Sequence, residues 1–418
     1  MRSLTRVSAS AQTTKYLRTA NTIDIILQST IRLCRRETEL MPGEDLRNEL
    51  GSYRSARALR RSGFLARHRR EIESILSVPE IHRSESKSPL LRSFLRVAQW
   101  NIERGEKWDL ILACLRDDPV LRWADVLLLN EADCGMARSG RRQVARCLAQ
   151  ELGMTMVFGP AYIELGEGTG GRESLQGNAV LTRYPVLDAR IKSLPACHDP
   201  FETEERRYGN RNCVWAALQL AEGALWVGST HLEVRGTPAC RARQMASLLG
   251  SHPGRPQSAC LIGGDLNTHG FSRGTFLRTM SALTRLVLSR PEVMKQRLLH
   301  PEYGTEPLFR AVQKAGFSWE RLNATEATAS TPLAGLEDAS LLPAWLARWA
   351  RRRLEPYKGE LDFKLDWLLG RRVRPLGPGE LRDTATGTYS MAPGCRPTIR
   401  TGPSRPSDHR PLYADIAL

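Results

Sequence analysis

The sequence has no apolar run long enough to cross a membrane as a helix. Such a helix needs roughly 18 or more consecutive apolar residues, whereas the longest apolar runs here, such as ADVLLLN at residues 124–130, have the length of a strand. The first residues also lack the apolar core of about 7–15 residues that a secretory signal contains. We therefore expect a protein without a transmembrane segment.

Several motifs of common enzyme classes and metal sites are also missing. There is neither a G-x-S-x-G turn nor a P-loop, which argues against an activated serine nucleophile and a P-loop nucleotide site. The nine cysteines include no C-x-x-C pair, and several of them lie in apolar patterns. We expect buried free thiols in a reducing, cytoplasmic compartment, and neither a disulfide framework nor a zinc site.

Negative charge is scarce. The formal net charge is +16 and the pI is about 9.8, with arginine far more frequent than lysine. A polyanionic partner, nucleic acid or an anionic membrane surface, would explain this balance, and so would an arginine-rich solvated surface. Residues 1–23 are basic, rich in Ser and Thr, and free of acids. They are typical of a transit segment or of a basic tail, and we favour the tail.

The chain divides by composition near residue 94. Residues 1–94 contain 18 Lys and Arg against 10 Asp and Glu. The apolar spacing predicts helices at 21–33 and 52–76, followed by a linker at 77–89. We interpret residues 1–94 as a basic, helical N-terminal extension. It is either a cap packed on the main domain or an arm that binds nucleic acid or lipid.

Residues 95–418 show short apolar runs separated by helical or turn-rich segments. This irregular mixture favours an α/β domain with mixed sheets over a regular βαβ barrel. The stretch at about 272–360 is basic and helix-rich, and we interpret it as an insertion between two core strands. Within it, residues 341–354 combine tryptophans with arginines and could contact an anionic membrane peripherally.

Polar side chains that can bind a metal or a phosphate follow the apolar runs of this second region. They are Asn101, Glu131, His231, Asp265 and Asn267, with Asp408 and His409 before the last run. Ligands gather where strand ends meet, and carboxylate and amide oxygens suit Mg²⁺ or Mn²⁺. Asp366 lies inside an apolar run, where a carboxylate is costly unless it is paired, and His409 is a natural partner. Each signal alone also fits a turn residue or a satisfied core residue.

Taken together and in order, these motifs resemble the endonuclease/exonuclease/phosphatase superfamily. The matching segments are WNIERG, LNEAD, GNAVLTRYP, STHLE, GGDLNT, KLDWLL and SDHRPL, spread over residues 95–418. Residues 1–94 have no counterpart in this resemblance. It implies the DNase I-like fold, a four-layer α/β sandwich of two packed mixed β-sheets flanked by helices.

The resemblance also implies roles for individual residues. Asn101 and Glu131 would hold Mg²⁺ or Mn²⁺ with Asp408 close by, and Asp265 with Asn267 would orient or deprotonate the attacking water. His409, held in one tautomer by Asp366, would contact the phosphate, and His231 would bind the phosphate from the other side. Asn178 of the GNAV motif, His231 and Asn267 are the expected substrate-binding residues.

The expected function is therefore metal-dependent hydrolysis of a phosphodiester, with nucleic acid favoured as substrate by the charge. The alternative with the same chemistry is a phospholipid, an inositol phosphate or another small phosphoester. A different alternative is a catalytically degenerate nucleic-acid-binding protein, against which the complete polar set argues. The sequence does not decide between endo- and exo-action, and it does not indicate an oligomeric state.

Overall fold

The protein is described here by a computed structural model. It covers residues 44–417 except for 86–88, 167–173, 204, 222, 255–256, 273–280, 282–283, 286–287, 333–351 and 397–404. The predicted helix at 21–33 and most of the tryptophan- and arginine-rich stretch at 341–354 lie outside these residues. Among the residues covered, no helix combines the length and the apolarity needed to span a membrane.

The larger sheet, sheet A, has the strand order β1-β4-β5-β3-β2-β16-β14, with β7 paired to β4 and β15 to β16. β2 and β3 run parallel, and β16 pairs antiparallel with β2. The carboxyl ends of β2 and β3 and the beginning of β16 therefore lie at the same end of sheet A. The strands are β1 (Glu80–His82), β2 (Leu95–Asn101), β3 (Val126–Cys134), β4 (Thr155–Glu164), β5 (Leu175–Thr182), β7 (Arg207–Gly209), β14 (Arg374–Pro375), β15 (Gly394–Cys395) and β16 (Leu412–Ala417).

The smaller sheet, sheet B, has the order β13-β10-β9-β8-β6. β10 lies between the parallel strand β9 and the antiparallel strand β13. The ends of β9 and β10 therefore meet the beginning of β13, just as strand ends meet in sheet A. The strands are β6 (Val186–Ser193), β8 (Asn212–Leu220), β9 (Gly223–His231), β10 (Ala259–Asp265) and β13 (Asp366–Arg371).

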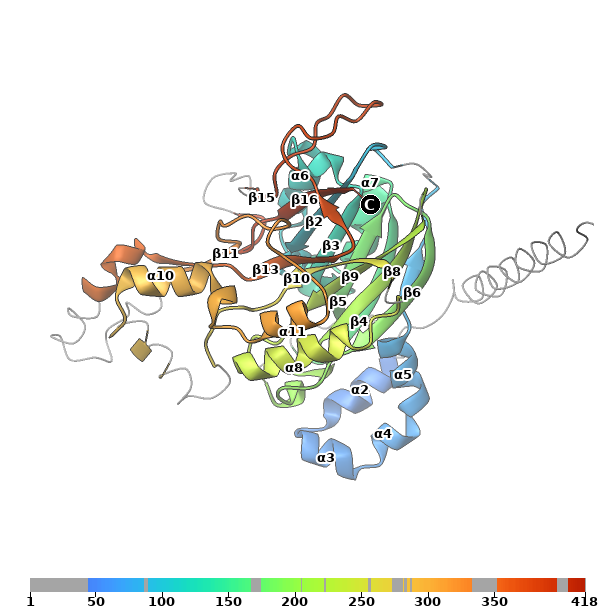
Figure 1. Cartoon of the computed structure of the whole chain (residues 1–418). Helices are drawn as coiled ribbons and strands as arrows, with labels where there is room; N and C mark the ends of the chain where they lie inside the picture. Colours follow the sequence, from blue (N-terminus) through green and yellow to red (C-terminus); the bar gives the residue numbers. More distant parts are fainter. Residues whose placement is uncertain are drawn as a thin grey trace, which may run out of the picture. The chain divides into compact units, whose positions relative to one another are not determined.

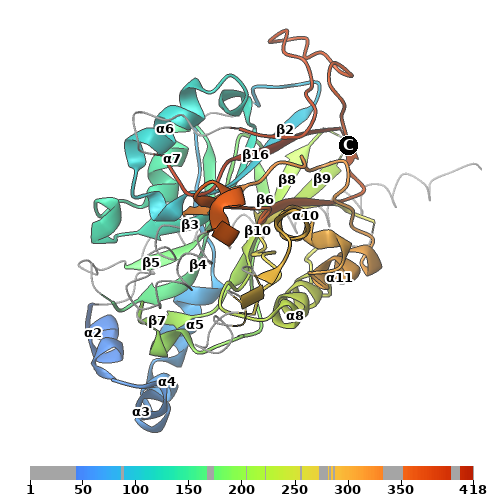
Figure 2. The ribbon, with the colours of Figure 1, turned by 90° about the vertical axis from the view of Figure 1, so that its left-hand side faces the viewer.

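The two sheets pack face to face through aliphatic side chains, and helices cover their outer faces. Val97 and Leu128 of sheet A share one buried cluster with Val227 and Leu261 of sheet B. Helices α6 (Trp108–Asp117) and α7 (Val144–Leu152) cover sheet A, and α8 (Pro238–Leu249) and α11 (Leu308–Lys314) cover sheet B (Figures 1 and 2). This arrangement confirms the predicted α/β sandwich of two packed mixed sheets flanked by helices.

The described part of the N-terminal extension packs on the main domain. It consists of α2 (Glu44–Ser52), α3 (Ala56–Arg61), α4 (Phe64–Arg67) and α5 (Arg69–Ser77). Leu50, Phe64 and Ile75 of these helices belong to the same buried cluster as the outer face of sheet A. The predicted linker at 77–89 is wrong at residues 80–82, because these residues form β1 and pair with β4.

Truncation of Phe64 should test how firmly the extension is held. Phe64 is fully buried and packs against the rings of Tyr53 and His68. Phe64→Ala is expected to lower the free energy of unfolding by about 3–5 kcal/mol, because it leaves a cavity in the shared core. Urea unfolding measures this effect, and Leu187→Ala on the exposed face of β6 is the control. Equal stability of both variants would contradict the shared core.

The connection between β10 and β13 combines helices with a β-ribbon that the helical pattern did not predict. It contains α10 (Pro291–Leu299), α11 and the antiparallel pair β11 (Ala329–Pro332) and β12 (Glu360–Phe363). Ser330 in β11 and Phe363 in β12 line the cavity described below. Along the whole described chain, short 3-10 helices are also present: η1 (Glu103–Gly105), η2 (Leu121–Trp123), η3 (Ala137–Ser139), η4 (Pro200–Glu202), η5 (Pro301–Tyr303) and η7 (Glu355–Tyr357).

One disulfide corrects the prediction of buried free thiols without disulfide bonding. Cys197 and Cys240 are joined, although they are 43 residues apart in sequence. Both lie outside the apolar strands, Cys197 in the segment after β6 and Cys240 in the first turn of α8. Their pairing depends on tertiary contacts, which spacing alone does not reveal. Cys147, Cys213, Cys260 and Cys395 are free thiols.

Candidate active site

The strand ends of both sheets open into one polar cavity of about 340 Å³. Strand register explains the convergence. In sheet B, Asp265 lies opposite His231 on one side and Asp366 on the other. In sheet A, Asn101 pairs with Asn130, the residue before Glu131. Seven of the nine predicted site residues line this cavity: Asn101, Glu131, His231, Asp265, Asn267, Asp408 and His409.

The two glycines before Asp265 allow the strands to approach closely. A Cβ atom on Gly264 would lie 1.7 Å from the carbonyl oxygen of Thr230 in β9. On Gly263, a Cβ would lie 2.5 Å from the Leu128 side chain of the facing sheet. At Gly264 the obstacle is backbone, so this position requires glycine, whereas a side chain at Gly263 would have to displace the Leu128 side chain.

Asp265 is buried at the centre of the hydrogen-bond network. Its Oδ1 accepts from the backbone N–H of Asn267 at 2.9 Å, and its Oδ2 accepts from the Asn101 amide at 3.2 Å. Burial raises the pKa of Asp265 to about 7, against the opposing effect of the His409 cation. A carboxyl group that titrates near neutral pH is suited to exchange a proton with water.

The two histidines of the cavity have opposite electrostatic environments. His409 Nδ1 lies 2.7 Å from Asp366 Oδ2, and its Nε2 lies 3.7 Å from Asp265 Oδ2. Burial disfavours the cation, but Asp366 and Asp265 outweigh it and raise the pKa of His409 well above its ordinary value. Burial, together with Arg211 and His409, lowers the pKa of His231. The cavity thus offers one cationic and one neutral imidazole at neutral pH.

Asn267 and His231 form a second contact pair. The amide nitrogen of Asn267 lies 3.0 Å from His231 Nε2 and also donates to the carbonyl of Leu232 at 3.0 Å. The backbone of Asn267 has a φ of 51°, in the left-handed region that asparagine tolerates better than most residues. This turn directs its amide toward the strand end.

Asn101 and Glu131 lie together at the end of sheet A. The Asn101 amide nitrogen is 3.3 Å from Glu131 Oε1. The pairing of β3 with β5 is irregular between Leu129 and Ala132, and Glu131 there has a φ of 57°. Such a bulge re-aims a side chain relative to a regular strand.

The donor chemistry of this pair fits a hard divalent cation. A carboxylate and a carboxamide oxygen are ligands that Mg²⁺ and Mn²⁺ accept. Asp408 lines the same cavity with an exposed side chain. In the part of the chain that the structure describes, no group of three His, Cys, Asp or Glu side chains forms a metal site.

Two predicted residues lie behind the cavity lining. Asp366 receives a hydrogen bond from the Gln99 amide at 3.1 Å besides its contact with His409. Asn178 accepts from the Asn130 amide at 2.9 Å and donates to Asn212 Oδ1 at 2.8 Å. Asn178 is not among the lining residues, and its direct contact with substrate stays a prediction.

Sequence reasoning missed two further residues. Asn130 Oδ1 accepts from the Gln99 amide and from the backbone N–H of Asp265 at 2.8 Å, which ties the sheets together. Arg211 is 7% exposed and lines the cavity. Its Nε makes no hydrogen bond within the described structure, and the nearest carboxylate oxygen, on Glu233, is 3.6 Å away. The signal available in the sequence was the position of Arg211 directly before a buried strand, in GNRNCVWAAL.

Comparison with known proteins places the chain. The model of the Endonuclease/Exonuclease/phosphatase family matches residues 98–409. Comparison with curated proteins finds no match.

Similar solved structures have low identity to this chain. An endonuclease/exonuclease/phosphatase from Beutenbergia cavernae DSM 12333 is 16% identical, with 78% of this chain and 72% of that chain covered and a TM-score of 0.43. The human Nocturnin catalytic domain is 15% identical, with coverages of 81% and 96% and a TM-score of 0.42. D. rerio TDP2 is 13% identical, with 78% of this chain and 100% of that chain covered and a TM-score of 0.42. On the family match, the chain belongs to the Endonuclease/Exonuclease/phosphatase family, whose members hydrolyse phosphoester bonds.

Proposed function

We propose that this protein hydrolyses phosphodiester bonds of nucleic acid in a reaction that depends on Mg²⁺ or Mn²⁺. The observation that carries the proposal is that two groups of side chains lie in one cavity. One is the Asn101–Glu131 pair, and the other is Asp265 beside the His409–Asp366 pair. Together they supply a cation site, a base near neutral pH and a cationic imidazole.

In this proposal, each residue of the site has its own role. Asp265 orients the attacking water and takes its proton, and the Asn267 amide helps to hold that water. His409, positioned by Asp366, donates to a phosphoryl oxygen and offsets the charge that develops in the transition state. Neutral His231 donates to another phosphoryl oxygen. A divalent ion at Asn101 and Glu131, with Asp408 nearby, would supply Lewis-acid stabilisation of the phosphoryl and leaving oxygens.

Arg211 adds a phosphate-binding group to this set. A buried guanidinium whose Nε lacks a partner among the described residues is costly unless an anion completes its hydrogen bonds. We expect Arg211→Met to lower kcat/KM by about 10²-fold, as removal of one oxyanion donor does, and Arg211→Lys to recover part of the loss. Steady-state kinetics measures both variants against Arg190→Met on the exposed part of β6. Equal kinetics of Arg211→Met and the control would contradict the assignment.

The choice of nucleic acid rests on charge. The net charge of +16 favours a polyanion, and Arg104 and Arg211 both line the cavity. An activity panel with Mg²⁺ tests the choice with plasmid DNA, abasic duplex, single-stranded RNA, sphingomyelin, phosphoinositides and a generic diester. Asp265→Asn is the blank. We expect nucleic acid to be cleaved and the lipids to remain intact, and the reverse result would overturn the proposal.

The pH dependence should report on Asp366. Its charge raises the pKa of His409, so the imidazole stays protonated to higher pH than it would alone. In Asp366→Asn that pKa falls, and the alkaline limb of the kcat/KM profile should move to lower pH as turnover drops. Asp188→Asn, an exposed change on β6, should leave the limb in place. An unmoved limb in Asp366→Asn would limit Asp366 to a structural role.

A further inference from the structure

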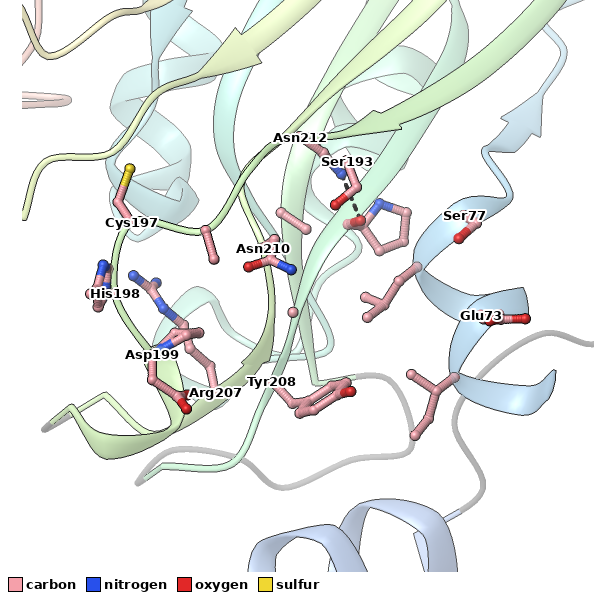
Figure 3. Close-up of a pocket in the computed structure, with 17 residues that line it drawn as sticks. Glu73, Ser77, Ser193, Cys197, His198, Asp199, Arg207, Tyr208, Asn210 and Asn212 are labelled. Atoms are coloured by element: carbon pink, nitrogen blue, oxygen red, sulfur yellow. Dashed lines mark hydrogen bonds between the residues drawn. The ribbon is translucent and has the colours of Figure 1, made fainter. Parts of the chain in front are cut away.

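The structure contains a second and larger cavity, of about 600 Å³ (Figure 3). One wall is α5 of the N-terminal extension, which contributes Ile72 and Leu76. The opposite walls are residues 160–161 of β4, strand β7 and the segment after β6. The resemblance to the family has no counterpart for α5, so this cavity includes a part of the chain that the family match leaves out.

A single stretch of backbone separates the two cavities. Asn210 and Asn212 line the larger cavity, whereas Arg211 between them lines the catalytic one. Successive side chains of an extended segment point to opposite faces, so residues 210–212 form the partition. The carboxylate of Glu233 lies at this partition too. Its Oε2 is 3.4 Å from His198 Nδ1 and 3.6 Å from Arg211 Nε.

The larger cavity combines apolar surface with polar groups that have unused hydrogen-bonding capacity. Figure 3 shows Asn210 directed into its middle, with His198 on one side and α5 on the other. Both ring nitrogens of His198 are buried and neither makes a hydrogen bond to a described residue, although Nδ1 faces the Glu233 carboxylate at 3.4 Å. Burial lowers the pKa of His198, which favours the neutral ring, and a neutral imidazole has one nitrogen that donates and one that accepts. The Tyr208 ring and Pro160 add flat apolar contact surface.

The charges at the cavity do not select an anion. Arg207, which lines it, donates to Gln176 and lies within 3.9 Å of the carboxylates of Glu164 and Glu205. Asp199 pairs with Arg60 and brings a further negative charge to the rim. A phosphate would meet these carboxylates. A neutral ring with hydrogen-bonding edges would meet a carboxamide, an imidazole and apolar walls.

We propose that this cavity binds an unpaired nucleobase of the nucleic-acid substrate, next to the phosphodiester that is cut. This proposal rests on the proposed function. A volume of about 600 Å³ accommodates a base with its sugar. Single-stranded nucleic acid is recognised through stacking of splayed bases and hydrogen bonds to their edges, which the ring of Tyr208 and the polar atoms of His198 and Asn210 supply. The helix α5 then acts as a substrate-binding wall.

The test is an abasic scan of a single-stranded oligonucleotide. Binding to the full chain is measured by fluorescence anisotropy in EDTA, where no turnover is expected, with one abasic residue moved along the oligonucleotide. At one position the abasic residue should weaken binding about 10-fold or more, the scale of one lost stacked base. In His198→Phe and in Asn210→Ala that position-specific loss should be smaller, because these variants already lack one of the contacts with the base. No base-sensitive position, or an undiminished loss in both variants, would overturn the inference.

Two controls separate this inference from the proposed function. Asn48→Ala, at another exposed asparagine, on α2, should keep the full abasic effect. Turnover of a small chromogenic diester should be unchanged in Asn210→Ala, since Asn210 does not line the catalytic cavity. Cleavage of nucleic acid without a base-sensitive position would overturn the base site alone. Failure to cleave any nucleic acid, with lipid cleaved instead, would overturn both proposals.

Discussion

Asp265→Asn is expected to lower kcat by about 10²–10⁴-fold, the usual effect of losing a general base. The melting temperature should stay close to that of the wild type, because asparagine keeps an oxygen that can accept the hydrogen bond from the backbone of Asn267. What the substitution removes is the group whose pKa burial raises to about 7. Turnover and thermal unfolding are measured on the same preparation. Turnover near the wild-type value would show that GGDLNT forms only a turn.

Asp383 offers a matched control for this substitution. It too accepts hydrogen bonds from backbone N–H groups, those of Arg92 and Ser93 among them, but it does not line the catalytic cavity. Those bonds outweigh burial and lower the pKa of Asp383 to about 2. Its folded-state pKa is below the unfolded value, so the charged form stabilises the fold above pH 4 or so. Asp383→Asn should therefore lower the melting temperature at pH 7 and leave kcat unchanged, the reverse of Asp265→Asn.

Removal of divalent ions with EDTA should abolish activity, and added Mg²⁺ or Mn²⁺ should restore it. Glu131 is the only carboxylate of the expected ion-binding pair, so Glu131→Gln should raise the Mg²⁺ concentration needed for half-maximal activity and lower the maximal rate by about 10²-fold or more. Activity titrated against Mg²⁺ measures both effects. Glu106→Gln, which also removes a negative charge from the cavity lining, is the control. Full activity in metal-free buffer would contradict a metal-assisted reaction.

The convergence of the site was predictable because strand ends have a simple geometry. Asn101, His231 and Asp265 each close an apolar run, and parallel pairing brings such ends to one edge. Asp366 was predictable for a different reason, since a carboxylate in an apolar strand needs a partner, and His409 is that partner at 2.7 Å. These inferences required only alternation, burial and pairing.

The remaining features depend on contacts between segments far apart in sequence. Arg211 looks like an ordinary surface arginine until the fold buries it beside the cavity. The bulge at Glu131 lies where the register between β3 and β5 shifts, and no local sequence pattern marks it. The larger cavity forms only where α5 meets β4 and β7. Single-sequence patterns describe elements well and describe the spaces between elements poorly.

The amide of Asn130 has a consequence for how this protein could change over evolutionary time. It joins β3 to β9 through Ser229 and Thr230, reaches Asn178 in β5, and accepts from the backbone of Asp265 in β10. Even the isosteric change to aspartate would lose the donor that all three acceptors share. The walls of the cavities, in contrast, come partly from peripheral segments. The β11–β12 ribbon forms part of the catalytic cavity, and α5 forms part of the larger cavity. New substrate preferences can therefore arise by drift in those peripheral segments while the reaction itself is inherited intact.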